Sequence, residues 1–190
     1  MVGRQDVALL LVQRGACVNK TNNFGWTPLT YSVNNGHYQT TSILLQNGAC
    51  PNKCDANGWT SLMHAARNGH WPIARLLLEH GADPLIQTTD RCYFTIKSSS
   101  SSSQSSSNSD QEAMNVEKCV DIGWSALMLA SAENHENFVS GLLHFLQAKD
   151  PFLLRCLVQL TDRDGRTAAH VTHSQMIVSL VNQHTIRCHH

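Results

Sequence analysis

The chain has 190 residues, of which 42% are hydrophobic, and its 14 basic side chains balance 14 acidic ones. This composition suffices for one domain with an ordinary core, and the zero net charge disfavours nucleic acid and membrane surfaces as partners. We predict neither a signal peptide nor a transmembrane helix. The seven cysteines are an odd number spread along the chain, which favours reduced thiols in the cytoplasm or nucleus.

Self-similarity is the strongest signal in the sequence. Gly25–Leu29 (GWTPL) returns as Gly58–Leu62 (GWTSL), one period of 33 residues later. A partial copy precedes the first motif, and further copies begin at Gly123 and at Asp164. Matches that recur at one fixed offset indicate a repeat protein.

Each copy predicts two short helices. Thr27 and Thr60 are suited to cap the first helix, because a threonine hydroxyl accepts a hydrogen bond from an otherwise unpaired N–H group. Gly36 and Gly69 are suited to the left-handed turn that ends this helix, and Asn134 stands at the equivalent place in a later copy. The second helix then carries a row of leucines.

Other recurring positions predict structural roles. The histidines that directly follow the turn recur in three copies, which favours a role in the turn over catalysis: His37, His70 and His135. The apolar residues that follow the capping position are expected in the core: Leu62, Met63, Leu127 and Met128.

Together these motifs resemble the ankyrin-repeat family, whose unit has a Gly-x-Thr-Pro-Leu-His opening, a Gly-His turn, a leucine row and a Gly-Ala-Asp close. The resemblance implies an all-α fold, a solenoid of helix-turn-helix units with β-hairpin fingers. One departure concerns the histidine of the opening motif, which only His170 keeps, since Thr30, Met63 and Met128 replace it elsewhere. We expect this departure to alter hydrogen bonds between neighbouring loops and to leave the fold intact.

The repeat pattern divides the chain. In chain order we predict a partial N-terminal repeat (1–20), repeats at 21–53 and 54–87, a disordered Ser-rich insertion (88–118), a repeat at 119–149, an extra helix (150–161), a degenerate C-terminal repeat (162–184) and a loose tail (185–190).

The predicted insertion contains ten serines between Ser98 and Ser109. Such a tract has too little apolar surface to offset the entropy of ordering it. It is either a passive low-complexity expansion or a regulatory loop. The second interpretation makes Ser107 and Ser109 possible phosphorylation sites, because each has an acidic residue three positions later.

Both ends depart from the pattern. The start lacks the first helix of a repeat and leaves Val7, Leu10 and Leu11 without a partner, so we expect a fragment, an incomplete gene model or a covered surface. Near the other end, Leu146 replaces an expected glycine, and Pro151 follows an acidic residue, which favours an extra helix.

An ankyrin stack binds partners through its finger tips and the concave face of its first helices. Trp26, Trp59 and Trp124 share one repeat position and should form a ladder along one edge, where they serve either partner binding or packing between neighbouring fingers. The residues that we expect at the same face are Phe24, Asn34, Asn35, Asn57, Arg67, Asn68, Ile122 and Glu133.

The sequence predicts a binding module and no enzyme. It contains no Gly-x-Ser-x-Gly, phosphate loop or His-Glu-x-x-His motif. Cys50-x3-Cys54 and the tail Cys188-His189-His190 lack a second ligand pair at zinc-finger spacing, so we expect no metal and no cofactor. We predict a monomeric, non-enzymatic scaffold or adaptor for a protein partner. The alternative is the recognition fragment of a larger signalling protein or of a ubiquitin-ligase substrate adaptor.

Overall fold

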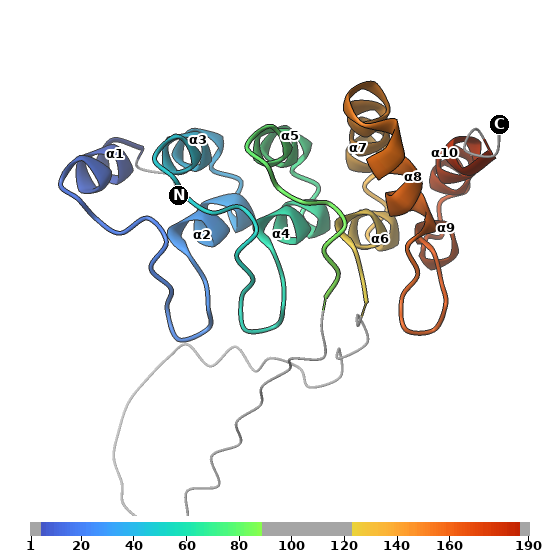
Figure 1. The fold of residues 1–190 in the computed structure, drawn as a ribbon, viewed down its shortest axis with the longest axis horizontal. Helices are drawn as coiled ribbons and strands as arrows, with labels where there is room; N and C mark the ends of the chain where they lie inside the picture. Colours follow the sequence, from blue (N-terminus) through green and yellow to red (C-terminus); the bar gives the residue numbers. More distant parts are fainter. Residues whose placement is uncertain (1–4, 89–122, 187–190) are drawn as a thin grey trace, which may run out of the picture.

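The computed structural model describes residues 5–88 and 123–186, which form a row of stacked helix pairs (Figure 1). The helices are α1 (Gln5–Gln13), α2 (Pro28–Asn34), α3 (Tyr38–Gln46), α4 (Ser61–Arg67), α5 (Trp71–Glu79), α6 (Ala126–Ala132), α7 (Glu136–Lys149), α8 (Pro151–Gln159), α9 (Ala168–Val171) and α10 (Gln175–Ile186). We name α2, α4, α6 and α9 the inner helices, because they lie on the side from which the long loops project (Figure 1). These loops are called fingers below.

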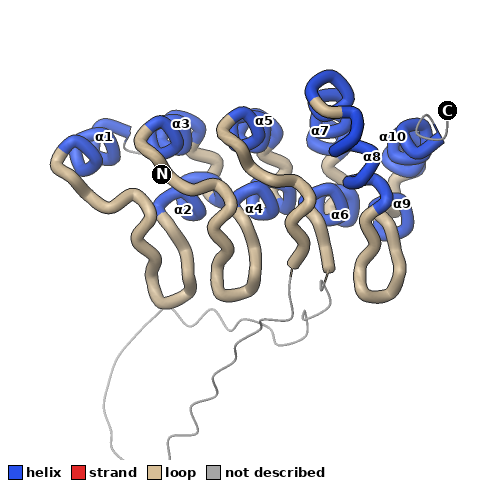
Figure 2. The backbone as a smooth tube through the Cα atoms, viewed as in Figure 1, coloured by secondary structure: helices blue, strands red, loops and turns tan. Residues whose placement is uncertain are grey.

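The expected all-α solenoid is confirmed, but the expected β-hairpins need a correction. In Figure 2 the fingers are hairpin-shaped loops, and no strand is found in residues 5–88 and 123–186. A single antiparallel bridge joins Gln87 and Ser125. The fingers lack a ladder because side-chain oxygens at their bases take up backbone N–H groups that a strand would otherwise pair.

The predicted start and end of the inner helices are confirmed. The Thr27 hydroxyl accepts a hydrogen bond from Thr30 N at 3.1 Å, and the Thr60 hydroxyl accepts one from Met63 N at 3.3 Å. Gly36, Gly69 and Asn134 all adopt positive φ angles, of 73°, 68° and 57°. These local signals act within a few residues, which explains why the sequence predicts them correctly.

The histidines of the turns pack against the preceding repeat. A Cβ atom added to Gly36 would lie 3.1 Å from His70 Nε2, and one added to Gly69 would lie 2.8 Å from His135 Nδ1. His135 Nε2 also lies 2.8 Å from the carbonyl oxygen of Arg67, where it can donate a hydrogen bond. These contacts agree with the expected structural role for His70 and His135, and they explain why small residues stand opposite these two rings.

One continuous core runs along the stack between the inner helices and the second helix of each pair. Leu62, Met63, Leu127 and Met128 are at most 1% exposed, as expected. The Trp71 ring lies 5.8 Å from the Phe138 ring and thereby joins α5 to α7, which precede and follow residues 89–122 in the sequence. Because the core continues from α5 to α7, the helix pairs before residue 89 and those after residue 122 pack into one body.

The two ends of the stack differ from its middle. At the start, α1 packs against α3 and leaves Val7, Leu10 and Leu11 between 43% and 54% exposed. Near the end, the Asp150 side chain accepts a hydrogen bond from Leu153 N at 2.9 Å and caps α8, which packs between α7 and α10.

Candidate binding surface

A single side-chain oxygen organises each finger. In the second finger, Asp55 Oδ1 accepts hydrogen bonds from Asn57 N at 2.8 Å and from Trp59 N at 3.0 Å. The same pair of bonds recurs in the first finger, where Asn22 holds the N–H groups of Phe24 and Trp26, and in the last, where Asp162 holds those of Asp164 and Arg166. The finger base therefore determines where the tryptophan backbone lies.

The third finger is closed in a related way. Thr88 takes the position of Asp55, and its hydroxyl accepts a hydrogen bond from Trp124 N at 2.9 Å. Thr88 N donates to Trp124 O, and Gly123 N donates to Thr88 O, both at 2.9 Å. Residues 89–122 thus stand where the second finger has only Ala56 and Asn57.

Several sequence predictions fall on this segment. Apart from Thr88, the predicted insertion at 88–118 lies outside the described residues, and so do the candidate phosphorylation sites Ser107 and Ser109. The candidate contact residue Ile122 lies outside them as well. These predictions remain predictions.

An aromatic row crosses the first two complete repeats. The Trp26 ring lies 4.9 Å from Tyr31 and 5.0 Å from His64, both in edge-to-face geometry. The centroid of the Trp59 ring lies 5.3 Å from that of the same His64 ring, in a tilted arrangement. His64 thus contacts both tryptophans, so the first two members of the predicted ladder are joined through an imidazole that the sequence analysis did not select.

His64 is oriented by a buried carboxylate. Its Nε2 lies 3.1 Å from Asp55 Oδ2, and the two residues are 7% and 8% exposed. One period earlier, Asn22 Nδ2 donates to the Tyr31 hydroxyl at 2.9 Å, which is the corresponding link from finger base to inner helix. The signal that could have identified Tyr31 and His64 is their shared repeat position beside the buried Thr30 and Met63.

The predicted polar residues gather beside this row. The Arg67 guanidinium lies 5.3 Å above the Trp59 ring, and Asn68 Nδ2 donates to Asn34 Oδ1 at 3.1 Å. Asn35 Nδ2 donates to the carbonyl oxygen of Tyr31 at 2.8 Å. The structure therefore brings four of the predicted side chains onto the ends of α2 and α4, next to the tryptophans.

Two predicted residues stand at the finger tips, and Phe24 is 66% exposed there, while Asn57 is also exposed. Glu133 is exposed at the end of α6. Trp124 differs, because it is only 9% exposed, and its Nε1 is buried with no hydrogen-bond partner in the part of the chain that is described. The inner-helix position of Tyr31 and His64 is Leu129 in this repeat, so no polar aromatic ring accompanies Trp124.

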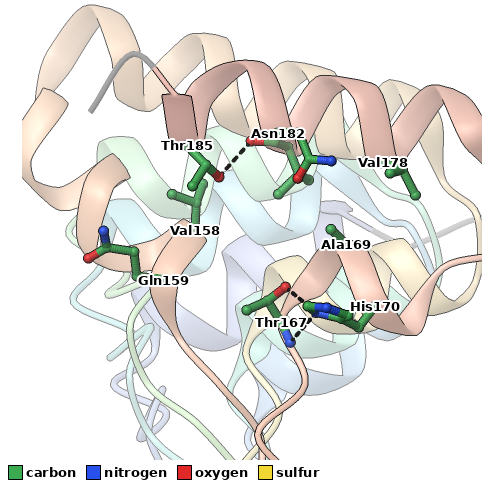
Figure 3. Close-up of a pocket in the computed structure, with 9 residues that line it drawn as sticks. Val158, Gln159, Thr167, Ala169, His170, Val178, Asn182 and Thr185 are labelled. Carbon is green, nitrogen blue, oxygen red and sulfur yellow. Dashed lines mark hydrogen bonds between the residues drawn. The ribbon is translucent and has the colours of Figure 1, made fainter. Parts of the chain in front are cut away.

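Figure 3 shows residues that line a hollow of about 420 Å³ between α8, α9 and α10. Its walls combine apolar side chains such as Val158 and Val181 with a few polar ones. His170 is the one ionisable side chain among the lining residues, and its Nδ1 lies 2.8 Å from the Thr167 hydroxyl. This hollow contains no set of groups for acid–base or nucleophilic chemistry.

The structure contains no assembled metal site in residues 5–88 and 123–186, since no three His, Cys, Asp or Glu residues come close enough there. Burial raises the pKa of the Cys54 thiol, and the neighbouring Asp55 and Cys50 raise it further. Cys54 is therefore held in the thiol form, which is a poor ligand and a poor nucleophile.

Stacked helix-turn-helix units with projecting fingers define a solenoid repeat protein. Residues 1–88 match the family of ankyrin repeats, in three copies. This part of the chain is therefore a set of ankyrin repeats, and repeats of this family are generally protein–protein interaction modules. A comparison with curated proteins finds no matching relative. None of the described helices is both long and apolar enough to cross a membrane.

Proposed function

We propose that this protein is a non-enzymatic scaffold or adaptor that binds a partner protein through the inner helices and fingers of its first two complete repeats. The aromatic row of Trp26, Tyr31, His64 and Trp59 supports this proposal best. It spans two repeats, it is partly exposed, and Arg67 extends it. Tryptophan, tyrosine and arginine are the residue types that most often contribute large shares of binding energy.

The arrangement of these side chains also favours binding over simple packing. A hydrogen bond between His64 Nε2 and the Asp55 carboxylate, and one from Asn22 to the Tyr31 hydroxyl, hold the rings before any partner arrives. A partner therefore loses less free energy in ordering them, which is the general advantage of a preorganised surface. The exposed Phe24 at the adjoining finger tip enlarges the apolar area that a partner can cover.

The experiment compares two exposed phenylalanines. The full chain and its Phe24→Ala and Phe152→Ala variants are immobilised, and the proteins that each retains from a cell extract are quantified by mass spectrometry. Phe24 is 66% exposed beside the aromatic row, whereas Phe152 is 75% exposed on α8. We expect Phe24→Ala to lose specific partners that Phe152→Ala keeps. Identical sets of retained proteins for all three would contradict the proposal.

The alternative keeps the same surface but places it in a longer chain, as the recognition part of a signalling protein or of a ubiquitin-ligase substrate adaptor. The exposed leucines of α1 favour this alternative, because Leu10 and Leu11 remain half exposed on a helix that packs against α3. Sequencing the full transcript distinguishes the two. An encoded repeat or effector domain joined to residues 1–190 would establish the alternative.

We further propose a monomer in the cytoplasm or nucleus. Light scattering of the purified chain tests the first point, and imaging of a fluorescent fusion tests the second. A dimer in solution, or a fusion protein in a secretory compartment, would contradict the respective proposal.

A further inference from the structure

The exposed charges that we identify on the proposed binding surface are positive. Between residues 7 and 78, Asp55 is the only acidic residue, and it is buried against His64. Lys20 and Lys53 are exposed on the first two fingers, and Arg67 is exposed at the end of α4. This surface therefore presents basic groups to a partner, and its single carboxylate is withdrawn into the interior.

The position of Arg67 strengthens the preference of this surface for an anionic group. Its guanidinium lies over the Trp59 ring at 5.3 Å, so the protein itself supplies the cation for this aromatic face. A lysine or arginine from a partner would meet like charge there and an aromatic face already in use. A carboxylate would meet a guanidinium held in place by the ring beneath it, which suits a charge-assisted hydrogen bond.

Apolar contacts lie next to the basic groups. Phe24 is 66% exposed and Tyr31 is 47% exposed, and Tyr31 packs edge-on against Trp26. A binding segment that carried charge alone would leave these rings in water. A segment with both carboxylates and apolar side chains would cover them and pair with Arg67 and Lys53.

We infer that the partner presents an acidic peptide segment with interspersed apolar side chains, and that this segment binds across α2 and α4 with a carboxylate at Arg67. The inference rests on the proposed function and specifies the chemistry of its partner. Long-range attraction to Lys20, Lys53 and Arg67 accelerates the encounter, while the rings and Arg67 provide the short-range contacts.

A peptide fits this surface better than a nucleic acid, which is also anionic. The chain has no net charge. The Trp26 ring meets Tyr31 and His64 at 64° and 66°, so the row offers no series of parallel faces for stacked bases. Single-strand binding requires such faces and a longer basic track.

The test selects binders from a library of random peptides displayed on phage, with the full chain as bait. A synthetic copy of an enriched peptide is then titrated by fluorescence anisotropy against the wild-type chain and two charge-reversal variants. Arg67→Glu changes the proposed contact. Arg75→Glu is the matched control, because Arg75 is exposed on α5 and pairs with Glu79. Thermal melting of each variant verifies that it is folded.

We expect the enriched peptides to be rich in aspartate, glutamate and apolar residues. Arg67→Glu should weaken their binding at least tenfold, about 1.4 kcal/mol, and Arg75→Glu should change it less than twofold. Added salt should weaken the wild-type complex, because exposed charges are screened.

The other outcomes separate this inference from the proposed function. If neutral or basic peptides bind and Phe24→Ala weakens them while Phe152→Ala does not, the surface binds proteins but the inferred chemistry is wrong. If nothing is enriched, or if all variants bind alike, both the inference and the proposed surface are rejected. If labelled oligothymidine binds as tightly as the best peptide, the partner class is nucleic acid and the inference is overturned.

Discussion

The second and third fingers share one sequence motif but differ in how its tryptophan is used. Trp59 is partly exposed between His64 and Arg67, whereas Trp124 is 9% exposed and its Nε1 is buried. The base of the second finger is a buried carboxylate that also orients His64, while the base of the third is the hydroxyl of Thr88. A repeat position thus determines where a tryptophan stands along the chain, and its neighbours determine whether it can meet a partner.

The largest expected effect is on stability at the buried tryptophan. Trp124→Ala should lower the free energy of unfolding by about 3–5 kcal/mol, the usual cost of truncating a buried tryptophan. Trp59→Ala should cost clearly less, because part of its ring is already in water. Urea unfolding followed by circular dichroism measures both. Equal losses would remove the distinction between the two fingers.

The next largest loss of stability is expected from substitutions at the bases of the second and third fingers. Asp55→Ala leaves two backbone N–H groups and the buried His64 without their acceptor, so it should cost about 3 kcal/mol. Thr88→Ala removes one acceptor, that of Trp124 N, and should cost about 1 kcal/mol. Thermal unfolding of both variants beside Asn57→Ala, an exposed tip residue, gives the comparison. A Thr88→Ala variant as unstable as Asp55→Ala would show that the hydroxyl supports the third finger equally well.

The last finger, whose base is Asp162, should make the stability of the protein depend on pH. Burial alone would raise the pKa of Asp162, but hydrogen bonds from the Arg166 backbone and side chain and from Asp164 N hold this pKa below its ordinary value. The stabilisation from ionised Asp162 is therefore complete above the ordinary aspartate pKa of about 3.9 and is lost as the pH falls through the lowered folded-state pKa.

The experiment for this pH dependence compares the wild-type chain with Asp162→Asn, which keeps an acceptor oxygen but cannot ionise. The free energies of unfolding of the two, measured by urea titration at each pH, should differ most near neutral pH, by about 1 kcal/mol, and should converge in acid. A difference that stays constant down to acid pH would show that the charge of Asp162 contributes nothing.

The smallest expected effect comes from making the third finger resemble the second. Replacing residues 89–122 with the dipeptide Ala-Asn should leave the unfolding midpoint within a few degrees, because Thr88 and Gly123 already close the finger base. Loop length changes the entropy of closure only slowly. A loss of cooperative unfolding would mean that this segment contributes to the stack, contrary to our prediction.

Particular residues show which features of the fold and of the candidate site could be predicted from the sequence. The caps at Thr27 and Thr60 and the positive φ angles of Gly36, Gly69 and Asn134 were predicted correctly, because each depends on atoms within a few residues. The candidate site was predicted only in outline. Arg67 reaches Trp59 within its own repeat, but the hydrogen bond from Asn68 to Asn34 joins residues about one repeat apart.

By itself the sequence determined the repeat period, the caps and turns that bound the inner helices, and the ankyrin character of residues 1–88, because these depend on local hydrogen bonding and on patterns that recur at one spacing. The tertiary structure decided which recurring residues face a partner. His64 became the centre of the aromatic row because Trp26 reaches it from the preceding repeat, and Trp124 became buried although its motif is the same. The contact of Trp26 with His64 joins residues more than one repeat apart, so no local pattern encodes it.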